Sequence, residues 1–593
     1  MRNGTVVRRA GVWCVGALGL ALVGCGPSST TGGGGGSAPA SDVKLTAADM
    51  ADFMKSNVTG KPGGRFTEAA IAAPKTWNVL LANETSSTIP LGYVFDSLVT
   101  RNPETLAMDP ALADSWTQSK DAKTWTFKLR KGVRWSDGQP FTADDVTFTF
   151  DLIYDKSIPT PIRDILTFDG KQLGYKKIDD LTVEFTLPSV IGPFLDVMGP
   201  PILPRHKLEA IWKAGKFNSA WALDAPPAEV VGTGPFAIAK YAANESITFR
   251  RNPYHWHVSA AGQPLPFLDG GVSEIVPDLN TMILRFKSKE TDYTALRPED
   301  WGIVKDGDSA GDYTAVDAGP SWGFSYLGFN VNPANKDMPE YKRAWFKKKE
   351  FRQAISYALD RGSMVKTALR GIGRPLWSPV SVANKTFYNE KLKPINQDAA
   401  KASALLASIG LSKKNGDGIL VDDAGHPVEF TLLTNSGNNI NYSLCVAVQE
   451  DLRKIGVRVT LQPIEFNSLV ERMRKTFNWE ANLLAFTGGA EPYNGRNIWM
   501  SSGQTHVWYP KEPSPDTPWE AEVDQIFNMA AREPNTAKRK MLYDRWQEIV
   551  YDQQPLIFLV TQNSLFAMRN RLTNVRPNSL GGIRWNNYEF SER

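Results

Sequence analysis

The chain has 593 residues, of which 42% are hydrophobic and 22% are charged, as is usual for a globular protein. This length exceeds what one hydrophobic core normally supports, so we expect two or three domains. The formal net charge is only +4. That value argues against nucleic acid as the main partner, because proteins that bind it concentrate basic residues on one face.

The N-terminus has the pattern of an export signal. A positively charged start precedes an apolar run over residues 10–23, which is too short for an ordinary membrane span. The run ends at Cys25 in the order Leu-Val-Gly-Cys, which looks like the lipobox of bacterial lipoproteins. We therefore predict a signal peptide over residues 1–24 and a lipid on Cys25. The alternative is a plain secretory signal that has a cysteine near its end by chance.

A tether and an arm are predicted over residues 25–72. The segment through Gly36 is rich in Gly and Ser, a composition that behaves as a random coil. Within the arm, residues 47–55 have the spacing of a short amphipathic helix. These features predict a protein of the cell envelope, held by its lipid in the periplasmic space or on the outer face of the cytoplasmic membrane.

Cysteine use predicts a fold without disulfides. Of the three cysteines, Cys14 lies in the signal peptide and Cys25 would carry the lipid, which leaves Cys445 alone. Because Cys445 lies in an apolar, helix-like stretch, we predict a buried structural thiol. The 18 Trp, 17 Tyr and 28 Phe residues suit a large core and a pocket that stacks on rings, peptide side chains or sugar faces.

The first half of the chain reads as sheet-rich. Residues 77–82 form a short apolar run that predicts a strand, and residues 124–130 and 181–187 alternate polar and apolar positions, as half-buried antiparallel strands do. Thr142 is a natural N-cap for a helix with two acids in its first turn. Residues 232–236, Gly-Thr-Gly-Pro-Phe, predict a tight turn before a strand, because the spacing does not match a phosphate-binding loop.

The second half alternates helices and strands. Helical spacing occurs over residues 351–360, 399–409 and 444–455, and the last of these leads into an apparent strand over residues 457–461. A late helix and a buried strand follow, over residues 546–551 and 555–560. This order predicts an α/β lobe with a largely parallel sheet.

Six segments, in this order, resemble a known family. They are residues 109–116, 125–138, 141–146, 232–236, 250–256 and 351–361. Together they are similar to the signature segments of the extracellular solute-binding proteins, family 5, of ABC transporters, the dipeptide- and oligopeptide-binding group. The likeness covers roughly residues 75–590. The tryptophans in these segments, Trp116, Trp125 and Trp135, are expected to be core residues and not ligand contacts.

The resemblance implies an α/β protein with the type II periplasmic-binding-protein fold, in which two lobes joined by a hinge carry an inserted third, α+β domain. Domain I would comprise residues 73–95, 226–325 and 556–593, domain II residues 96–225, and domain III residues 326–555. The implied protein is the substrate-binding subunit of an ABC importer. It would capture peptides in the interdomain cleft by hinge closure and deliver them to a membrane permease and its ATPase subunits. We expect a monomer without cofactor or metal.

One departure from the family bears on the ligand. In the peptide-binding relatives, an aspartate of domain III pairs with the free amino terminus of the peptide. In the matching stretch, residues 485–495, the position of that aspartate is occupied by Gly488 or Gly489. Glu491 aligns better with a second acid of the loop. A buried ammonium group needs a charged partner. Either Glu491 makes this contact from a shifted loop, or the ligand has no free amine, as in an oligosaccharide, a blocked peptide or a decorated small molecule.

The candidate ligand-binding residues combine this loop with nearby rings and amides. They are Asn83, Trp322, Phe324, Asn435, Thr487, Gly488, Gly489, Glu491 and Trp499. Further rings could come from His506 and Trp508, and further amides from Asn438 and Asn439. The competing interpretation is that the rings pack in the core and that the asparagines form a turn.

Catalytic motifs are weak. His255 and His257 could chelate a metal on a strand, but neither an acid nor a third ligand stands at a useful spacing. No His-Glu-x-x-His motif is present. We therefore predict a binding protein with no catalytic residues and regard a hydrolytic enzyme as a remote alternative. A solute receptor that serves a sensor kinase is a further class, which the sequence does not separate from transport.

Overall fold

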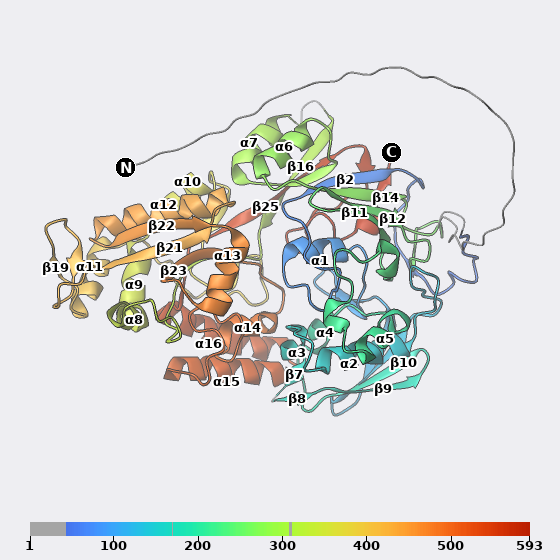
Figure 1. Ribbon diagram of the computed structural model, residues 1–593, viewed down its shortest axis with the longest axis horizontal. Helices are drawn as coiled ribbons and strands as arrows, with labels where there is room; N and C mark the ends of the chain where they lie inside the picture. Colours follow the sequence, from blue (N-terminus) through green and yellow to red (C-terminus); the bar gives the residue numbers. More distant parts are fainter. Residues whose placement is uncertain (1–42, 169, 308–310) are drawn as a thin grey trace, which may run out of the picture. The chain divides into compact units, whose positions relative to one another are not determined.

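Strands that lie far apart in the sequence meet in four main sheets of a mixed α/β architecture (Figure 1). The computed structural model describes residues 43–168, 170–307 and 311–593. The predicted signal peptide, Cys25 and most of the tether lie outside these residues. Within them, no helix has both the length and the apolar character needed to cross a membrane.

Two four-stranded sheets lie in the part of the chain before residue 276. In the first, with the order β11-β12-β14-β2, the β14–β2 pair is parallel and the other pairs are antiparallel. The second, with the order β5-β6-β10-β9, is antiparallel throughout. The strands are β2 (Arg65–Ala70), β5 (Ala113–Gln118), β6 (Thr124–Leu129), β9 (Gly174–Asp179), β10 (Thr182–Thr186), β11 (Phe236–Ala242), β12 (Ser246–Arg251) and β14 (Gly270–Ile275).

A third sheet is organised around one long strand near the C-terminus. Strand β25 (Val560–Arg569) pairs with β15 (Tyr293–Leu296), β16 (Tyr313–Pro320) and β18 (Gly373–Pro375), and all three pairs are antiparallel. The fourth sheet has five strands in the order β22-β21-β23-β17-β24. These are β17 (Phe324–Phe329), β21 (Glu429–Asn435), β22 (Arg458–Ile464), β23 (Ala481–Phe486) and β24 (Leu556–Phe558).

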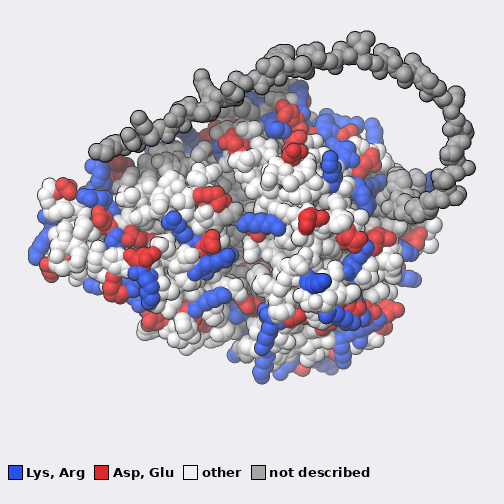
Figure 2. Space-filling view, viewed as in Figure 1, with Lys and Arg blue, Asp and Glu red and all other residues white. Residues whose placement is uncertain are grey.

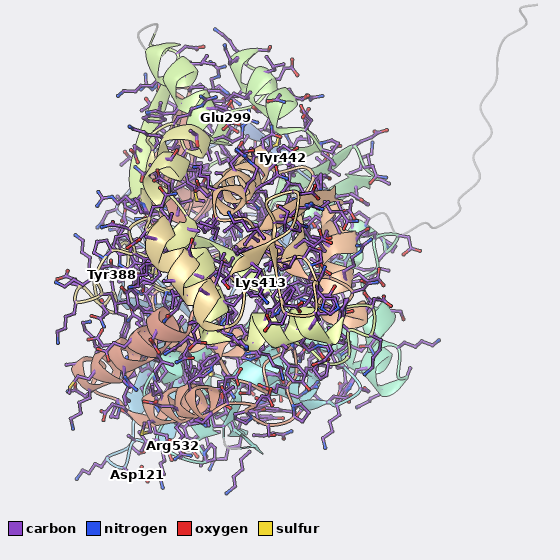
Figure 3. All side chains as sticks on the ribbon, turned by 90° about the vertical axis from the view of Figure 1, so that its left-hand side faces the viewer. Asp121, Glu299, Tyr388, Lys413, Tyr442 and Arg532 are labelled. Atoms are coloured by element: carbon purple, nitrogen blue, oxygen red, sulfur yellow. The ribbon has the colours of Figure 1, made fainter. Side chains whose placement is uncertain are left out.

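Helices cover both faces of the five-stranded sheet. Because side chains alternate along a strand, Leu327 and Phe329 of β17 pack with helices α8 to α12, whereas Phe324 and Tyr326 pack with α14 to α16. The helices are α8 (Glu340–Lys347), α9 (Lys349–Ala358), α10 (Arg361–Ala368), α11 (Ala399–Ser408), α12 (Asn439–Lys454), α13 (Phe466–Glu471), α14 (Arg496–Trp499), α15 (Pro518–Arg532) and α16 (Thr536–Gln553). Figure 3 shows α12 from outside, with Tyr442 exposed.

The remaining elements are short. The helices are α1 (Thr85–Leu91), α2 (Ala143–Tyr154), α3 (Ile162–Ile165), α4 (Phe194–Val197), α5 (Arg205–Lys213), α6 (Leu279–Lys287) and α7 (Pro298–Gly307). Two-stranded ladders join β1 (Met54–Lys55) to β13 (His257–Val258), β3 (Val99–Arg101) to β4 (Met108–Pro110), β7 (Thr167–Phe168) to β8 (Lys171–Gln172), β19 (Lys413–Lys414) to β20 (Leu420–Val421), and β26 (Leu572–Thr573) to β27 (Ser591–Glu592). On the face seen in Figure 2, basic and acidic side chains are interspersed.

Most of the predicted elements are confirmed. Strands β6 and β10 have the predicted alternation, and α2 begins at a capping box in which Thr142 accepts from the backbone N–H of Asp144 and Asp145 accepts from that of Thr142. The predicted buried thiol is also confirmed, since Cys445 is fully buried and burial raises its pKa to about 12. The five-stranded sheet is mixed and not largely parallel, because β17 pairs antiparallel with both of its neighbours.

Two local predictions are wrong, and hydrogen bonds seen in the structure give the reason. Residues 77–82 form a turn and not a strand, because the side-chain oxygen of Asn78 accepts from the N–H of Leu80 at 3.2 Å. Residues 47–55 form turns and then β1 in place of a helix. There the carboxylate of Asp49 accepts from Thr46, and the N–H of Met54 donates to the carbonyl oxygen of Trp256.

Candidate functional site

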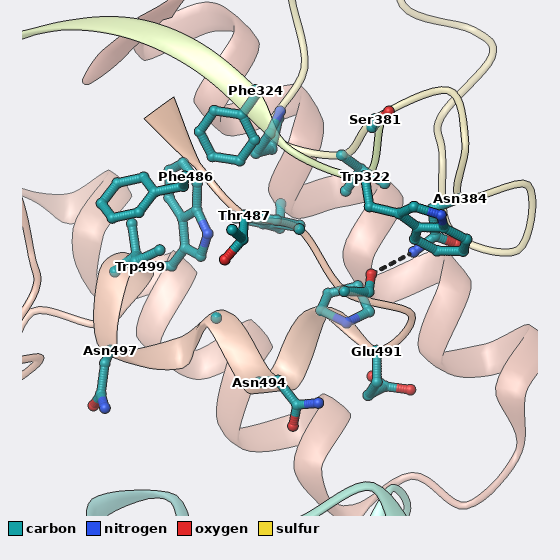
Figure 4. A pocket seen from close by; sticks show the side chains of 18 of the residues that line it. Trp322, Phe324, Ser381, Asn384, Phe486, Thr487, Glu491, Asn494, Asn497 and Trp499 are labelled. Carbon is teal, nitrogen blue, oxygen red and sulfur yellow. Dashed lines mark hydrogen bonds between the residues drawn. The ribbon is translucent and has the colours of Figure 1, made fainter. Parts of the chain in front are cut away.

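A loop over residues 487–495, which we name the cleft loop, lies where three cavities adjoin. It follows β23 and ends at the start of α14. The aromatic cavity, of about 470 Å³, is lined by Trp322, Phe324, Trp499 and Trp546 together with most of the cleft loop. Figure 4 shows Trp322, Phe324, Phe486 and Trp499 around this space. Rings arranged in this way can stack on apolar groups or on the faces of sugars.

The other two cavities share walls with the first. The neutral cavity, of about 340 Å³, uses the same Trp322, Phe324 and Gly488 and adds Asn438 and Gln562. The charged cavity, of about 940 Å³, meets the cleft loop at Gly489, Ala490 and Asn494; its other walls come from segments near residues 54–58, 92–111, 255–257 and 576–589. The cleft loop therefore contacts all three spaces.

Gly488 permits a close backbone approach at the wall shared by the aromatic and neutral cavities. A Cβ atom built on Gly488 would lie 1.7 Å from the carbonyl oxygen of Trp322, whereas one built on Gly489 would meet nothing within 4 Å. Any residue larger than glycine at position 488 would push the loop away from Trp322. The close contact with Trp322 therefore explains why position 488 holds glycine.

The cleft loop is held in place by one amide side chain. The Nδ2 of Asn384 donates to the carbonyl oxygens of Gly489 and Ala490, each at 3.1 Å. Figure 4 marks the bond to Gly489. The Oδ1 of Asn384 accepts from the N–H of Phe387, also at 3.1 Å. Asn384 therefore joins the loop to the segment after β18.

Glu491 is the one charged residue among the described side chains that line the aromatic cavity, and it is paired. It is 3% exposed, and its Oε2 lies 3.1 Å from Nη2 of Arg539 on α16. Burial outweighs this partner and raises the pKa of Glu491 to about 7. No charged residue is among the described residues that line the neutral cavity.

In the charged cavity, both arginines that line the wall are paired with carboxylates of the protein. Arg101 pairs with Asp196, and Arg576 pairs with Glu104 at 3.0 Å and with Glu589 at 2.6 Å. Asp96 is half-buried and accepts from Nε1 of Trp256 at 2.8 Å, and burial of its carboxyl group raises its pKa to about 6.

The two histidines considered as metal ligands bond to each other. His255 donates from Nδ1 to the carbonyl oxygen of Thr233 at 3.2 Å, and its Nε2 accepts from Nδ1 of His257 at 3.0 Å. Burial lowers the pKa of His255 to about 3 and that of His257 well below its usual value, so both rings are neutral. The ring of Tyr588 stacks on His257 with centroids 4.2 Å apart.

The structure brings together seven of the nine ligand-binding candidates within the described residues. Trp322, Phe324, Thr487, Gly488, Gly489, Glu491 and Trp499 line the aromatic cavity. Asn83 is exposed ahead of α1 and lines none of the three cavities, and neither does Asn435, whose Oδ1 accepts from the N–H of Gly437 at 3.1 Å.

Of the additional rings and amides, Asn438 lines the neutral cavity and caps α12. His506 and Trp508 lie outside the three cavities, and Trp508 donates to Glu520 at 2.8 Å. Sequence reasoning did not find Asn384, Asn494, Asn497 or Arg539. Asn494 lies in the stretch 485–495 that the family resemblance located, whereas the segments of the other three carry no recognisable motif.

Comparison with known proteins places the chain among solute-binding proteins. It is 29% identical to a probable ABC transporter-binding protein of Deinococcus radiodurans over 532 residues, which cover 86% of this chain and 89% of the relative. It is 27% identical to the oligopeptide-binding protein AppA of Bacillus subtilis over 523 residues, again 86% and 89% of the two chains.

Solved structures agree with this placement. The structure of Bacillus subtilis AppA in complex with a nonapeptide matches with a TM-score of 0.76 and 25% identity, over 90% of this chain and 100% of that one. The structure of MelB from Agrobacterium fabrum in complex with stachyose also gives a TM-score of 0.76, at 23% identity, over 92% and 86% of the two chains. The fold is the type II periplasmic-binding-protein fold that the sequence predicts. Residues 107–506 match the family described as bacterial extracellular solute-binding proteins, family 5 Middle, and the chain belongs to that family.

Proposed function

We propose that this chain is the substrate-binding subunit of an ABC importer that captures peptides in the cavities around the cleft loop. The observation that carries the proposal is the likeness to AppA, in sequence over 86% of this chain and in structure over 90% of it. AppA is an oligopeptide-binding protein. The bound solute would be passed to a membrane permease powered by ATPase subunits, and no bond would be made or broken.

The domain boundaries predicted from sequence, the lipid on Cys25, the location in the cell envelope and the monomeric state belong to the same proposal. Hinge motion between domains would open and close the charged cavity, whose walls include the cleft loop and segments of the first half of the chain. The contacts between α14 and the segment that includes α3 support such closure. Nη1 of Arg496 donates to the carbonyl oxygens of Asp164 and Thr167 at 3.1 and 3.0 Å, and the rings of Tyr493 and Phe168 stack.

A second candidate ligand is a neutral, polar solute such as an oligosaccharide. It is favoured by the lining of the aromatic and neutral cavities, where the single charged side chain among the described residues, Glu491, already pairs with Arg539. A free α-ammonium group would have to compete with that guanidinium for one carboxylate. Stacking rings and amide side chains suit a neutral ligand without such competition.

Native mass spectrometry of the gently purified chain tests the proposal, because a ligand held in a closed cleft survives purification when it binds tightly. A spread of peptide masses supports peptide capture, and masses spaced by hexose units support the second candidate. If no mass is retained, a thermal-shift screen of both ligand classes follows. Turnover of a bound ligand by the purified chain would contradict the proposal of a binding protein.

A matched pair of peptides then tests whether Glu491 binds the amino group of a ligand or serves only in the ion pair with Arg539. One peptide has free termini, and the other has the same sequence with an acetylated N-terminus and an amidated C-terminus. If Glu491 binds the amino group, capping should weaken binding at least ~10-fold, in line with the loss of a hydrogen bond to a charged group. Equal or tighter binding of the capped peptide would assign the cleft to ligands without a free amine.

A further inference from the structure

Three buried side chains that line none of the three ligand cavities converge behind the aromatic cavity. They are His506 and Glu512, from the loop between α14 and α15, and Glu520, from the first turn of α15. Their exposed fractions are 0%, 3% and 4%. One ligand atom from each residue can be chosen so that all three atoms lie within 4.8 Å of one another. The proposed capture of solutes leaves this cluster without a role.

The histidine presents a free lone pair to the cluster. Nδ1 of His506 donates to the carbonyl oxygen of Ile498 at 3.0 Å, so Nε2 is the unprotonated nitrogen of the neutral ring. Nε2 is buried and has no hydrogen-bond partner among the described residues. It faces Oε2 of Glu512 at 3.9 Å, and this atom is likewise buried without a partner in the described part of the chain. A lone pair and a carboxylate oxygen that face each other need a proton or a metal cation between them, and 3.9 Å is too long for a hydrogen bond that a proton would form.

The two carboxylates are fixed by other bonds. Oε1 of Glu512 accepts from the N–H of Asp516 at 3.1 Å, which leaves Oε2 directed at the histidine. The oxygens of Glu520 accept from Nε1 of Trp508 at 2.8 Å and from Oγ1 of Thr517 at 2.6 Å, and each oxygen retains a lone pair. The nearby cation Arg352 donates its hydrogen bonds to the carbonyl oxygens of Phe346, Lys347 and Gln553.

We propose that His506, Glu512 and Glu520 bind a divalent transition-metal ion, and that Zn²⁺ fits best. One imidazole nitrogen and two carboxylate oxygens form a donor set that Zn²⁺ accepts, usually with water as a fourth ligand. A histidine ligand that donates its other N–H to a backbone carbonyl is the arrangement typical of metal sites. Bonds of roughly 2.0–2.2 Å would bring Nε2 and Oε2 slightly closer than the 3.9 Å that separates them.

The position of the site suggests what the ion does. Ile498, whose carbonyl accepts from His506, lines the aromatic cavity, as do Asn497 and Thr505. Glu520 belongs to α15, which packs with α16 beneath the same cavity. An ion held by both segments would fix the wall of the aromatic cavity to the helical layer, in the manner of a structural metal site.

The test uses the purified, untagged full chain, freed of metal with a chelator and titrated with Zn²⁺ against a chromophoric competitor. We expect one equivalent to bind and the thermal midpoint to rise on binding. Glu512→Gln should weaken Zn²⁺ binding more than ~100-fold, beyond the effect of losing an outer-shell partner, and should abolish the thermal shift. This variant keeps the size of the side chain, and its amide can donate to Nε2 of His506, so the fold has reason to survive.

His506→Gln provides a second ligand variant, and His426→Gln is the matched control, because His426 is a partly exposed histidine that pairs with Asp422. The control should bind Zn²⁺ as the wild type does. Cobalt replaces zinc in a further measurement on the wild type alone, where visible absorption bands of four-coordinate Co²⁺ with nitrogen and oxygen ligands are expected. The proposal is overturned if the wild type binds no more tightly than Glu512→Gln, or if both ligand variants keep full affinity.

Discussion

Two buried glutamates, one that lines the aromatic cavity and one outside it, differ in how their charge is compensated. Glu491 and Glu512 are both 3% exposed. Burial raises the pKa of Glu491 to about 7 and that of Glu512 to about 8. Glu491 has a guanidinium partner 3.1 Å away, whereas Glu512 faces a neutral histidine at 3.9 Å.

The difference indicates which of the two carboxylates already has a cationic partner within the protein. Removing two charges from water is costly, and a buried pair persists when its attraction and its hydrogen bonds offset that cost. Glu491 meets this condition in part, because Arg539 offsets some of the cost while burial still raises the pKa of Glu491. Since the carboxylate is already paired, its capacity to bind a ligand amine is reduced. Glu512 does not meet it among the described residues, which leaves that site able to accept a cation.

Breaking the Glu491 pair should have the largest effect on stability. Arg539→Met leaves a buried carboxylate without its cation, and we expect the free energy of unfolding to fall by about 3–5 kcal/mol at pH 8. Urea denaturation measures this loss. The double variant Arg539→Met with Glu491→Gln should recover at least half of it, because no uncompensated charge remains. A loss under ~1 kcal/mol in the single variant would show that the pair contributes little.

The pH dependence of stability tests the same comparison. The pKa of Glu491 rises from 4.5 to about 7 on folding, so the folded chain binds this proton more tightly. The resulting stabilisation is complete below pH 4.5 and is lost as the pH rises through 7, by at most ~3 kcal/mol. Urea denaturation between pH 5 and 8 should therefore show a smaller decline in Glu491→Gln than in the wild type.

The control for this measurement is Glu390→Gln, which changes an exposed glutamate outside the three cavities. It should reproduce the pH profile of the wild type. Parallel profiles for the wild type and Glu491→Gln would refute the raised pKa and would indicate that the guanidinium fully offsets the burial of the carboxylate.

Two adjacent glycines of the cleft loop, Gly488 and Gly489, should differ in how much stability a substitution by alanine removes. Gly488→Ala would place a Cβ atom 1.7 Å from the carbonyl oxygen of Trp322, so the loop must move, at a cost of about 1–3 kcal/mol in unfolding free energy. Gly489→Ala places its Cβ in open space, and we expect a change within ~0.5 kcal/mol. Thermal or urea denaturation distinguishes them, and equal effects would contradict the close approach of the loop to Trp322.

Local sequence patterns predicted much of the fold, but they could not predict features that depend on contacts between residues far apart in the chain. The capping residue Thr142 and the alternation of residues 124–129 act within a few positions, so one sequence displays them. The turn at Asn78 shows how a single side-chain bond can outweigh an apolar run. For the site, family likeness located the cleft loop, Trp322 and Trp499. The partners that fix the loop, Asn384 and Arg539, lie 105 and 48 residues from the atoms they bind, and no periodicity connects such positions.

The smallest predicted effect concerns Asn384. Asn384→Ala removes the donor to the carbonyl oxygens of Gly489 and Ala490 together with the oxygen that accepts from Phe387. We expect a loss of about 1 kcal/mol in unfolding free energy. Local opening should become more frequent, so amide hydrogen exchange over residues 487–495 should accelerate while exchange in α12 stays unchanged. Asn384→Asp keeps that acceptor but turns a buried carboxylate oxygen toward the two carbonyl oxygens, so it should cost more. Unchanged exchange in the cleft loop of both variants would mean that the contact of Gly488 with Trp322, and not Asn384, holds the loop in place.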